Sequence, residues 1–169
     1  MTAVIMAGGE GLRLRPLMLD TPKPMLKVGD KPLLATLVEQ LRRAGCDRIY
    51  LVVRYLREQL EDYFGDSVLY LREPEPYGTA GGLTLIPKDE RPTEPFLVVN
   101  ADILTTLDFG AVVRYHVGCR SNLLTLVRRP YTITIPYGWP VVRDGVVTGF
   151  REKPTREYLV NSGIYCLSP

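Results

Sequence analysis

Up to about residue 120, short apolar runs alternate with segments of helical spacing. Residues 2–7 (TAVIMA) form a continuous apolar run that ends at a glycine, as expected of a buried parallel strand. Residues 32–44 carry apolar side chains at helical spacing, with Pro32 in the first turn and Gly45 just beyond the last. Further elements are predicted, namely strands at 48–53, 67–71 and 96–100 and a helix at 55–64. The alternation predicts an α/β fold with a mostly parallel sheet and right-handed crossovers.

Beyond residue 120 the pattern changes to β-rich segments separated by prolines. The stretches SNLLTLV, ITIPYGWPVV and GVVTGF have the composition of strands, and residues 143–145 (RDG) have that of a turn. Because no linker separates this part from the rest, we expect its strands to be added to the same sheet. In the earlier part, Thr79 is expected to cap a short helix that runs through Leu85.

The composition excludes several classes of protein. The chain has 169 residues, enough for one domain with a sizeable core, and its net charge of +2 comes from 21 basic and 19 acidic residues. Nucleic-acid binders usually concentrate basic residues on one face, so a nucleic-acid partner is disfavoured. The N-terminus has no basic segment before its apolar run, and no apolar run approaches ~18 residues, so we predict neither secretion nor membrane insertion.

Three cysteines, Cys46, Cys119 and Cys166, are odd in number and widely spaced, without a CxxC motif or a Cys/His cluster. This pattern predicts reduced, buried cysteines in a cytoplasmic protein, instead of a disulfide framework or a zinc site.

A glycine-rich turn follows the first predicted strand, and two basic residues follow it among prolines. Gly8, Gly9 and Gly11 would let backbone N–H groups approach phosphates, and Arg13 and Lys23 would add cations. A P-loop is nearly excluded because the turn lacks a Gly-Lys-Ser/Thr ending. A dinucleotide fingerprint is disfavoured because a leucine holds its third glycine position and the following prolines prevent a regular helix. A phosphate-binding loop and an ordinary turn with solvated cations remain as alternatives.

The segment from Gly8 to Pro32 as a whole resembles the signature of the sugar nucleotidyltransferases (nucleoside-diphosphate-sugar pyrophosphorylases), written GGxGTRLxPLT…PKPMLxV…KP. The matching positions are Gly8, Gly9, Gly11, Arg13, Leu14, Pro16, Leu17, Pro22, Lys23, Pro24, Met25, Leu26, Lys31 and Pro32. Later segments resemble the family in the same order, namely PYGTAGGL (76–83), FLVVNADIL (96–104), PYGWPVV (136–142), FREKP (150–154) and VNSGIYCLSP (160–169). The resemblance is closest to the mannose-1-phosphate guanylyltransferase-like branch.

This resemblance implies a Rossmann-like three-layer αβα nucleotidyltransferase fold with a nucleotide-binding half at about 1–110 and a sugar-phosphate-binding half at about 111–169. The implied reaction transfers a nucleotidyl group from an NTP to a sugar 1-phosphate and releases pyrophosphate. Arg13 is implied to neutralise the leaving pyrophosphate, and Lys23 to bridge the α-phosphate and the sugar phosphate. The nucleotide-binding residues implied in this way are Ala7, Gly8, Gly9, Gly11, Leu12, Arg13, Glu73, Gly78 and Thr79.

Two carboxylates are given separate roles. Asp102 follows a predicted strand, where a carboxylate beside a triphosphate is a credible Mg²⁺ ligand; without the resemblance, a cap or turn would be the better interpretation. Glu73 stands five residues before Gly78, where pyrimidine-using relatives tend to place glutamine. A carboxylate accepts from both N1–H and N2–H₂ of guanine, which favours GTP. The alternative for Glu73 and Glu75 is that both are solvated loop charges.

The resemblance implies that the sugar 1-phosphate contacts residues in the last part of the chain, where Glu152 would accept from sugar hydroxyls and Lys153 would contact the phosphate. These residues are Tyr137, Gly138, Glu152, Lys153 and Asn161. Three other polar or aromatic residues are expected to be structural, namely Asn100, His116 and Trp139.

The chain departs from the family pattern in several places. Leu12 and Met18 replace threonines, and Ala101 replaces the glycine of NGD. The family has a second metal-binding aspartate beyond NSGIY, whereas this chain ends at Pro169. We therefore expect either a fragment without its C-terminal part, which would expose apolar surface or form homo-oligomers, or a protein with impaired catalysis. Two other functions remain open: a thymidylyl- or uridylyltransferase for glucose or N-acetylglucosamine 1-phosphate, and a non-catalytic relative that binds nucleotide sugars and regulates a partner.

Overall fold

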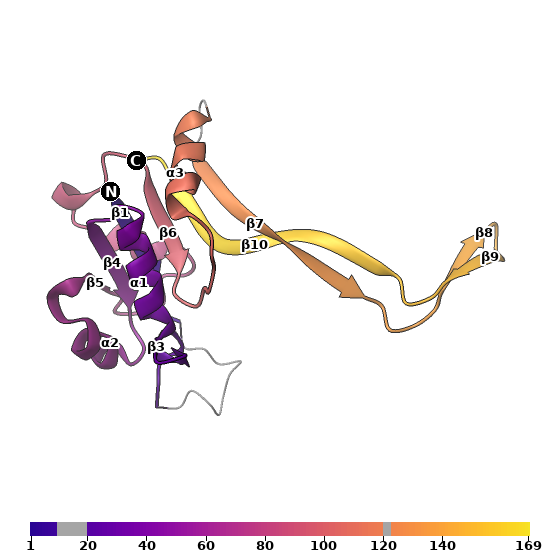
Figure 1. Ribbon diagram of the computed structural model, residues 1–169, viewed down its shortest axis with the longest axis horizontal. Coiled ribbons are helices and arrows are strands. Elements are labelled where there is room, and N and C mark those ends of the chain that lie inside the picture. Colours follow the sequence, from indigo (N-terminus) through magenta and orange to yellow (C-terminus); the bar gives the residue numbers. More distant parts are fainter. Residues whose placement is uncertain (10–19, 120–122) are drawn as a thin grey trace. The chain divides into compact units, whose positions relative to one another are not determined.

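The computed structural model of the protein describes residues 1–9, 20–119 and 123–169 (Figure 1). The chain divides into two compact units, of which the first comprises residues 1–126 and 163–169 and the second residues 127–162.

A six-stranded sheet with the order β5-β4-β1-β6-β10-β7 is the framework of the fold. Its strands are β1 (Thr2–Met6), β4 (Arg48–Val53), β5 (Leu69–Arg72), β6 (Phe96–Asn100), β7 (Leu124–Thr134) and β10 (Thr155–Leu167). β5, β4, β1 and β6 are parallel, whereas residues 164–167 of β10 pair antiparallel with β6. The predicted α/β fold with a mostly parallel, mixed sheet is confirmed. Its central strands are continuous apolar runs because they are buried on both faces.

Within the described ranges, three α-helices connect the strands, α1 (Leu33–Arg43), α2 (Arg57–Phe64) and α3 (Phe109–Gly118). In α1 the predicted apolar face is buried, and Gly45 has a φ of +90° just beyond the last turn, as a helix-terminating glycine should. α2 begins two residues later than predicted because Leu56 adopts a left-handed backbone with a φ of 50°. The shorter elements are η2 (Lys23–Met25), β2 (Lys27–Val28), β3 (Lys31–Pro32), η3 (Gly65–Ser67), η4 (Gly81–Leu85) and η5 (Lys88–Glu90).

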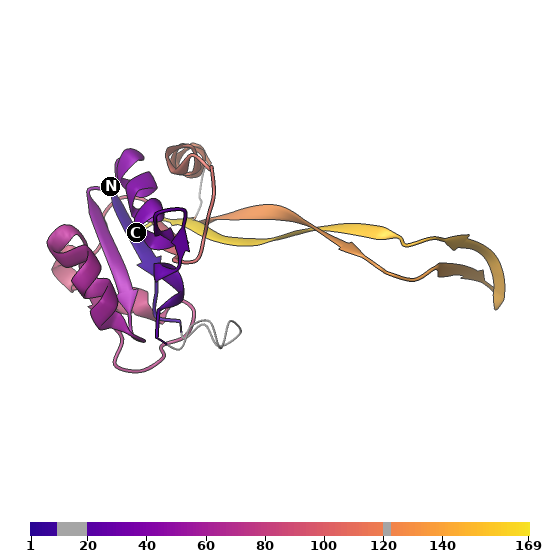
Figure 2. The same cartoon turned by 60° about the horizontal axis from the view of Figure 1, so that its bottom comes forward.

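Both faces of the parallel strands are covered. On one face Val4, Val52 and Val98 pack in a buried cluster with Ile86, which follows η4. On the other face the alternate residues of the same strands are also buried. The chain passes from β1 to β4 and then to β5 in one direction, so right-handed crossovers place α1 and α2 on the same face. Figures 1 and 2 show this layering, in which the carboxyl ends of the parallel strands share one edge.

The short helix predicted after Thr79 is the 3-10 helix η4, and the prediction that Thr79 caps it is wrong. Ala80 is the residue before η4, and no side-chain hydrogen bond caps the helix. A Cβ on Gly81 would lie 2.3 Å from the Cβ of Tyr77, so the backbone turns back on itself before η4. Adjacent glycines at 81 and 82 permit this tight turn and disfavour a longer α-helix.

The second unit contains an antiparallel hairpin of β8 (Trp139–Arg143) and β9 (Val146–Arg151). Asp144 and Gly145 both have positive φ, 49° and 79°, which is the backbone of a type I′ hairpin turn and confirms the turn predicted at residues 143–145. The expectation that all the late strands join one sheet is wrong for this hairpin, because β8 and β9 form a separate two-stranded sheet. Prolines at 136 and 140 remove the backbone donors that a continuous ladder would need.

The three cysteines are free thiols, of which Cys46 and Cys166 are buried as predicted, whereas Cys119 is only half-buried. Burial raises the pKa of both Cys46 and Cys166 to about 11, so neither thiol ionises at neutral pH. Within the described ranges, no helix is long and apolar enough to cross a membrane.

Candidate functional site

A cavity of about 280 Å³ lies at the carboxyl ends of the parallel strands. Its lining comes from the ends of β1, β4, β5 and β6 and from the loop after β5: Met6, Gly8, Gly9, Val52, Arg54, Glu73, Pro76, Gly78, Thr79 and Asn100. After β1 the chain adds β4 and β5 on one side of it and later β6 on the other, so the strand order reverses at β1. Open α/β sheets bind ligands outside the carboxyl ends of their strands at such a reversal.

Several predicted nucleotide residues are brought together in this cavity, namely Gly8, Gly9, Glu73, Gly78 and Thr79. The predicted Ala7 is buried beside them, and its backbone N–H donates to the Val52 carbonyl at 2.9 Å. Gly78 has a φ of +80°, which favours glycine at the turn leading to Thr79. Gly11, Leu12 and Arg13, also predicted for this site, lie outside the described residues.

Two glycines make room for the side chain of Glu73. A Cβ on Gly8 would lie 2.8 Å from Glu73 Oε2. A Cβ on Gly82 would lie 3.2 Å from Glu73 Oε1 and 2.5 Å from Val52 Cγ1. Because a well-packed site does not absorb contacts this short without moving, a larger residue at either position would displace the carboxylate. The sequence pattern assigned no role to Gly82.

Glu73 is a buried carboxylate with an unused acceptor. The residue is 7% exposed, and Oε1 has no hydrogen-bond partner within the part of the chain that the structure describes. Burial raises the pKa of Glu73, and the positive charge of Arg54 acts in the opposite direction. The interpretation of Glu73 as a solvated loop charge is therefore wrong, whereas Glu75 is exposed. An unpaired buried acceptor costs free energy unless a ligand supplies a donor.

Lys23 and Asp102 form an ion pair at the same edge of the sheet. Lys23 begins η2, where Pro22 has a φ of −65° and Pro24 is buried, so the backbone around the lysine is restrained on both sides. Asp102 follows the end of β6, and its side chain is about as exposed as that of Lys23, 37% against 35%. The pair therefore places a cation and a carboxylate in contact where water and ligands can still reach both.

Asn100, the last residue of β6, contributes to the cavity and contacts the segment VNSGIYCLSP. A Cβ on Gly163 would lie 2.6 Å from Asn100 Nδ2, and Gly163 has a φ of +75°. Glycine is therefore required at 163 both by its backbone and by its close approach to Asn100.

His116 has the structural role predicted for it. It lies on α3, is 2% exposed, and both ring nitrogens have partners, Thr125 Oγ1 at 2.9 Å and Ser168 Oγ at 3.1 Å.

In the second unit, residues predicted to bind the sugar phosphate lie on the two segments that lead into β8 and out of β9. The Ile135 N–H donates to the Pro154 carbonyl at 3.0 Å, which holds the entry to β8 against the exit of β9. A Cβ on Gly138 would lie 3.4 Å from Glu152 Oε2, so these two predicted residues are neighbours. Lys153 has a left-handed φ of 41°, which is uncommon for lysine. Tyr137 is 75% exposed, and Asn161 is exposed on β10.

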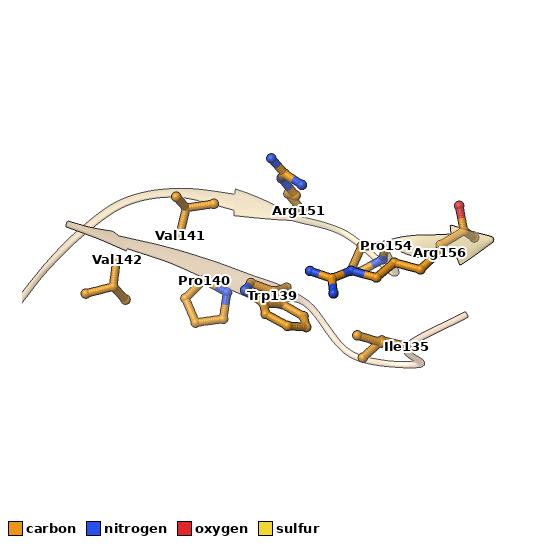
Figure 3. A pocket seen from close by; sticks show the side chains of 9 residues that line it. Ile135, Trp139, Pro140, Val141, Val142, Arg151, Pro154 and Arg156 are labelled. Atoms are coloured by element: carbon orange, nitrogen blue, oxygen red, sulfur yellow. The ribbon is translucent and has the colours of Figure 1, made fainter. Parts of the chain in front are cut away.

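The same unit holds a second cavity, of about 310 Å³, that the sequence pattern did not indicate (Figure 3). It is lined by Ile135, Trp139, Pro140, Val141, Val142, Arg151, Pro154, Thr155 and Arg156. The guanidinium carbon of Arg156 lies 5.4 Å from the centre of the Trp139 indole, a cation–π contact that packs the aromatic ring against its own unit. Trp139 has this contact but is 43% exposed and lines the cavity, so its structural role stays a prediction.

The donor set fits a magnesium ion that is shared with phosphates. Among the residues that the structure describes, no group of three or more His, Cys, Asp or Glu side chains is placed to hold a metal ion by itself. Mg²⁺, however, is commonly bound by one or two carboxylates together with the phosphate oxygens of a substrate. Asp102, two residues after the Asn100 that lines the cavity, offers one carboxylate, which suits that second kind of site.

The fold and the cavity define an α/β protein with a ligand site at the topological switch point of its sheet. Residues 2–169 match the Nucleotidyl transferase family, and the chain belongs to this family.

Several named relatives resemble the chain over nearly its whole length. It is 36% identical to the mannose-1-phosphate guanylyltransferase catalytic subunit beta of Drosophila pseudoobscura pseudoobscura, over 99% of this chain and 48% of that protein. It is 35% identical to the D-glycero-alpha-D-manno-heptose 1-phosphate guanylyltransferase of Aneurinibacillus thermoaerophilus, over 98% of this chain and 74% of that one. The chain thus spans about half the length of the mannose-1-phosphate guanylyltransferases that it matches.

Solved structures show the same fold. HddC from Yersinia pseudotuberculosis complexed with GMP-PN is 28% identical, with a TM-score of 0.74 over 99% of this chain and 76% of that one. A putative glucose-1-phosphate thymidylyltransferase from Bacillus anthracis has a TM-score of 0.76 over 99% of this chain and 71% of that one; at 21% identity, this likeness concerns the fold alone.

Proposed function

We propose that the chain is the catalytic part of a sugar-1-phosphate guanylyltransferase, which converts GTP and a sugar 1-phosphate into a GDP-sugar and pyrophosphate. The observation that carries the proposal is the buried Glu73 carboxylate, whose Oε1 lacks a partner among the described residues and which lines the cavity. Guanine presents two neighbouring donors, N1–H and N2–H₂, that such a carboxylate accepts. Uracil and thymine have no comparable pair of donors.

The comparisons support the same nucleotide. The matching curated relatives named above are guanylyltransferases, and one solved relative above 25% identity holds GMP-PN. Mannose 1-phosphate and a heptose 1-phosphate are the sugar phosphates in the names of these relatives, and we propose a sugar 1-phosphate of this class as the second substrate.

In the proposed reaction an oxygen of the sugar phosphate attacks the α-phosphorus of GTP, and the bond from that phosphorus to the β-phosphate oxygen breaks. The electron pair of the broken bond leaves with pyrophosphate, so the protein need not form a covalent intermediate. Lys23 is proposed to place its ammonium between the two reacting phosphates, where it reduces their mutual repulsion. Pro22 and Pro24 restrain the backbone beside Lys23, so little conformational freedom is lost when the phosphates bind.

Asp102 is proposed to hold Mg²⁺ together with the phosphates of GTP. When bound, the ion supplies positive charge to the phosphate oxygens. With the ion bound, Asp102 would exchange its ion pair with Lys23, and the lysine ammonium would be available to the phosphates. Arg13 is proposed to neutralise the pyrophosphate, on the sequence resemblance alone.

The sugar 1-phosphate is proposed to bind the second unit at the loop that Gly138, Glu152 and Lys153 form. The supporting observations are the proximity of Gly138 to Glu152 and the left-handed backbone at Lys153. Residues held in such uncommon conformations cluster at ligand sites. Tyr137 and Asn161 complete the proposed set.

The experiment that tests the function is pyrophosphate release with GTP, ATP, UTP or dTTP against a panel of sugar 1-phosphates, with Mg²⁺ and with EDTA. We expect release with GTP and Mg²⁺ that depends on the sugar 1-phosphate, and none with EDTA. Preferential release with UTP or dTTP would overturn the choice of nucleotide. GTP binding without turnover in any combination would favour a non-catalytic, nucleotide-binding relative.

A further inference from the structure

Arg54 and Glu73 are neighbours across two parallel strands. Val53 of β4 pairs in register with Arg72 of β5, so the next residue on each strand is Arg54 on one and Glu73 on the other. The Glu73 N–H donates to the Val53 carbonyl at 3.0 Å, which continues the ladder to this point. Adjacent strands lie about 4.8 Å apart, so the two residues leave the sheet side by side.

Both residues line the 280 Å³ cavity at the strand ends. Arg54 is half-buried, and the β-carbon of its side chain lies 3.6 Å from where a Cβ on Gly8 would be. The charge of Arg54 also acts on Glu73, where it opposes the effect of burial on the carboxyl group. The cavity is therefore lined by an acidic and a basic side chain from the ends of neighbouring strands.

The side chains of Glu73 and Arg54 have opposite hydrogen-bonding capacities. An ionised carboxylate only accepts hydrogen bonds, and a guanidinium only donates them. Guanine carries its donors, N1–H and N2–H₂, directly beside its O6 acceptor, with the N7 acceptor next in line. Adenine has a donor, N6–H₂, where guanine has O6, so it would set that donor against the guanidinium.

We propose that Arg54 is a second specificity-determining residue of this site, which donates to O6 and N7 of guanine while Glu73 accepts from N1–H and N2–H₂. The inference rests on the proposed function and names the residue that excludes adenine from the site. Glu73 distinguishes guanine from the pyrimidines through its acceptors, and Arg54 distinguishes guanine from adenine through its donors.

The test measures binding of GTP and three analogues to the whole chain by titration calorimetry. Inosine triphosphate lacks the N2 amino group that Glu73 contacts. 7-Deaza-GTP lacks N7, and 6-thio-GTP has a weak acceptor in place of O6. We expect the wild-type protein to bind each analogue about tenfold or more weakly than GTP, the usual scale for loss of a good base contact.

The variant Arg54→Met removes the donors and keeps much of the side-chain length. We expect it to bind GTP roughly tenfold to a hundredfold more weakly than the wild type and to bind GTP, 7-deaza-GTP and 6-thio-GTP equally. Its preference for GTP over inosine triphosphate should be retained, because that contact belongs to Glu73. The matched control is Arg57→Met, which removes a partly exposed arginine of α2 that pairs with Glu58, and it should bind all four nucleotides as the wild type does.

Three results would overturn the role of Arg54. The first is an Arg54→Met protein with the wild-type ratios among GTP, 7-deaza-GTP and 6-thio-GTP. The second is an Arg54→Met protein that loses only its preference for GTP over inosine triphosphate, which would mean that Arg54 acts only through Glu73. The third is a wild-type protein that binds the O6 and N7 analogues as well as GTP. If Arg54→Met does not fold, Arg54→Lys keeps the positive charge without the planar guanidinium. The preference of this variant for GTP over 7-deaza-GTP and 6-thio-GTP should then be smaller than that of the wild type.

Failure of the proposed function has a separate signature. A wild-type protein that binds UTP as tightly as GTP overturns the guanine site and this inference together. A wild-type protein that prefers GTP, with an Arg54→Met variant that keeps every analogue ratio, overturns only the inference.

Discussion

Lys23 forms an ion pair with Asp102, a residue 79 positions further along the chain. The lysine comes from a proline-restrained 3-10 turn and the aspartate from the turn that follows β6. Both side chains are about one third exposed, so neither partner is sealed from ligands. The pair joins the cation proposed for the reacting phosphates to the carboxylate proposed for Mg²⁺, and each is predicted to exchange its partner when nucleotide binds.

Lys23→Met should reduce turnover severely. Loss of a preorganised positive group beside developing charge typically costs about 100-fold to 1,000-fold in kcat. The measurement is pyrophosphate release with GTP and a sugar 1-phosphate, and the control is Lys27→Met, which removes an exposed lysine of β2. Equal rates in the wild type and Lys23→Met would show that the ammonium has no part in the reaction.

Asp102→Asn should raise the Mg²⁺ concentration needed for half-maximal turnover, and EDTA should abolish turnover in the wild type. Asparagine keeps the shape of the side chain but loses the charge that a hard cation prefers. A titration of the rate with Mg²⁺ measures this, with Asp30→Asn, an exposed change in the turn between β2 and β3, as the control. An unchanged Mg²⁺ dependence in Asp102→Asn would assign the metal to other groups.

Gly163→Ala should destabilise the fold. Its φ of +75° is costly for alanine, and the added Cβ would lie 2.6 Å from Asn100 Nδ2, so we expect a loss of about 2–4 kcal/mol in the free energy of unfolding. Urea unfolding measures the difference. The control is Gly149→Ala in β9, where a Cβ would meet nothing within 4 Å, and it should change stability by no more than about 0.5 kcal/mol. Similar stabilities of both variants would contradict the close contact at Asn100.

The central strands and α1 could be predicted because their patterns depend on local properties of the sequence. The runs at 2–6, 48–53 and 96–100 are mostly apolar on both faces, and Gly45 follows the last turn of α1. The start of α2 could not be predicted, because leucine rarely adopts a left-handed backbone and nothing in the sequence indicates that Leu56 does. The separate sheet of β8 and β9 was also missed, because strand composition does not determine which strands pair.

The candidate site was predictable only in part. The glycine turn and Asp102 lie in segments that resemble the family, and Glu73 was found by its spacing from Gly78. Arg54 lies in none of these segments, and Gly82 lies in one of them without an assigned role. The role of Arg54 follows from the parallel register of β4 and β5, and that of Gly82 from its packing distance to Glu73. Both are contacts between residues far apart in the sequence, which a local pattern does not show. In the structure Arg54 and Glu73 each come directly after a strand, and parallel strands end at the same edge; the strand predicted at 67–71 ended one residue before β5 does.

Glu73→Gln should stabilise the unliganded fold at neutral pH. Burial raises the pKa of Glu73 above its ordinary value of 4.5, so ionisation of this carboxyl favours the unfolded chain. The loss of folding stability caused by ionised Glu73 is complete above the raised pKa and shrinks as the pH falls through that pKa. It is absent below about pH 4.5, the ordinary pKa of the group. Urea unfolding of both proteins at neutral pH and at about pH 4.5 measures the difference, with the exposed Glu75→Gln as the control. A gain that is the same at both pH values would contradict a buried carboxylate.

The nucleotide preference of Glu73→Gln tests the central claim most directly. Glutamine replaces one acceptor oxygen with an N–H₂ donor, so it no longer accepts from both N1–H and N2–H₂ of guanine. The measurement is the ratio of GTP to UTP affinity in the wild type, Glu73→Gln and Glu75→Gln. We predict that the ratio favours GTP in the wild type and in Glu75→Gln, and that it falls about tenfold or more in Glu73→Gln. An unchanged ratio in Glu73→Gln would contradict selection of guanine by the buried carboxylate.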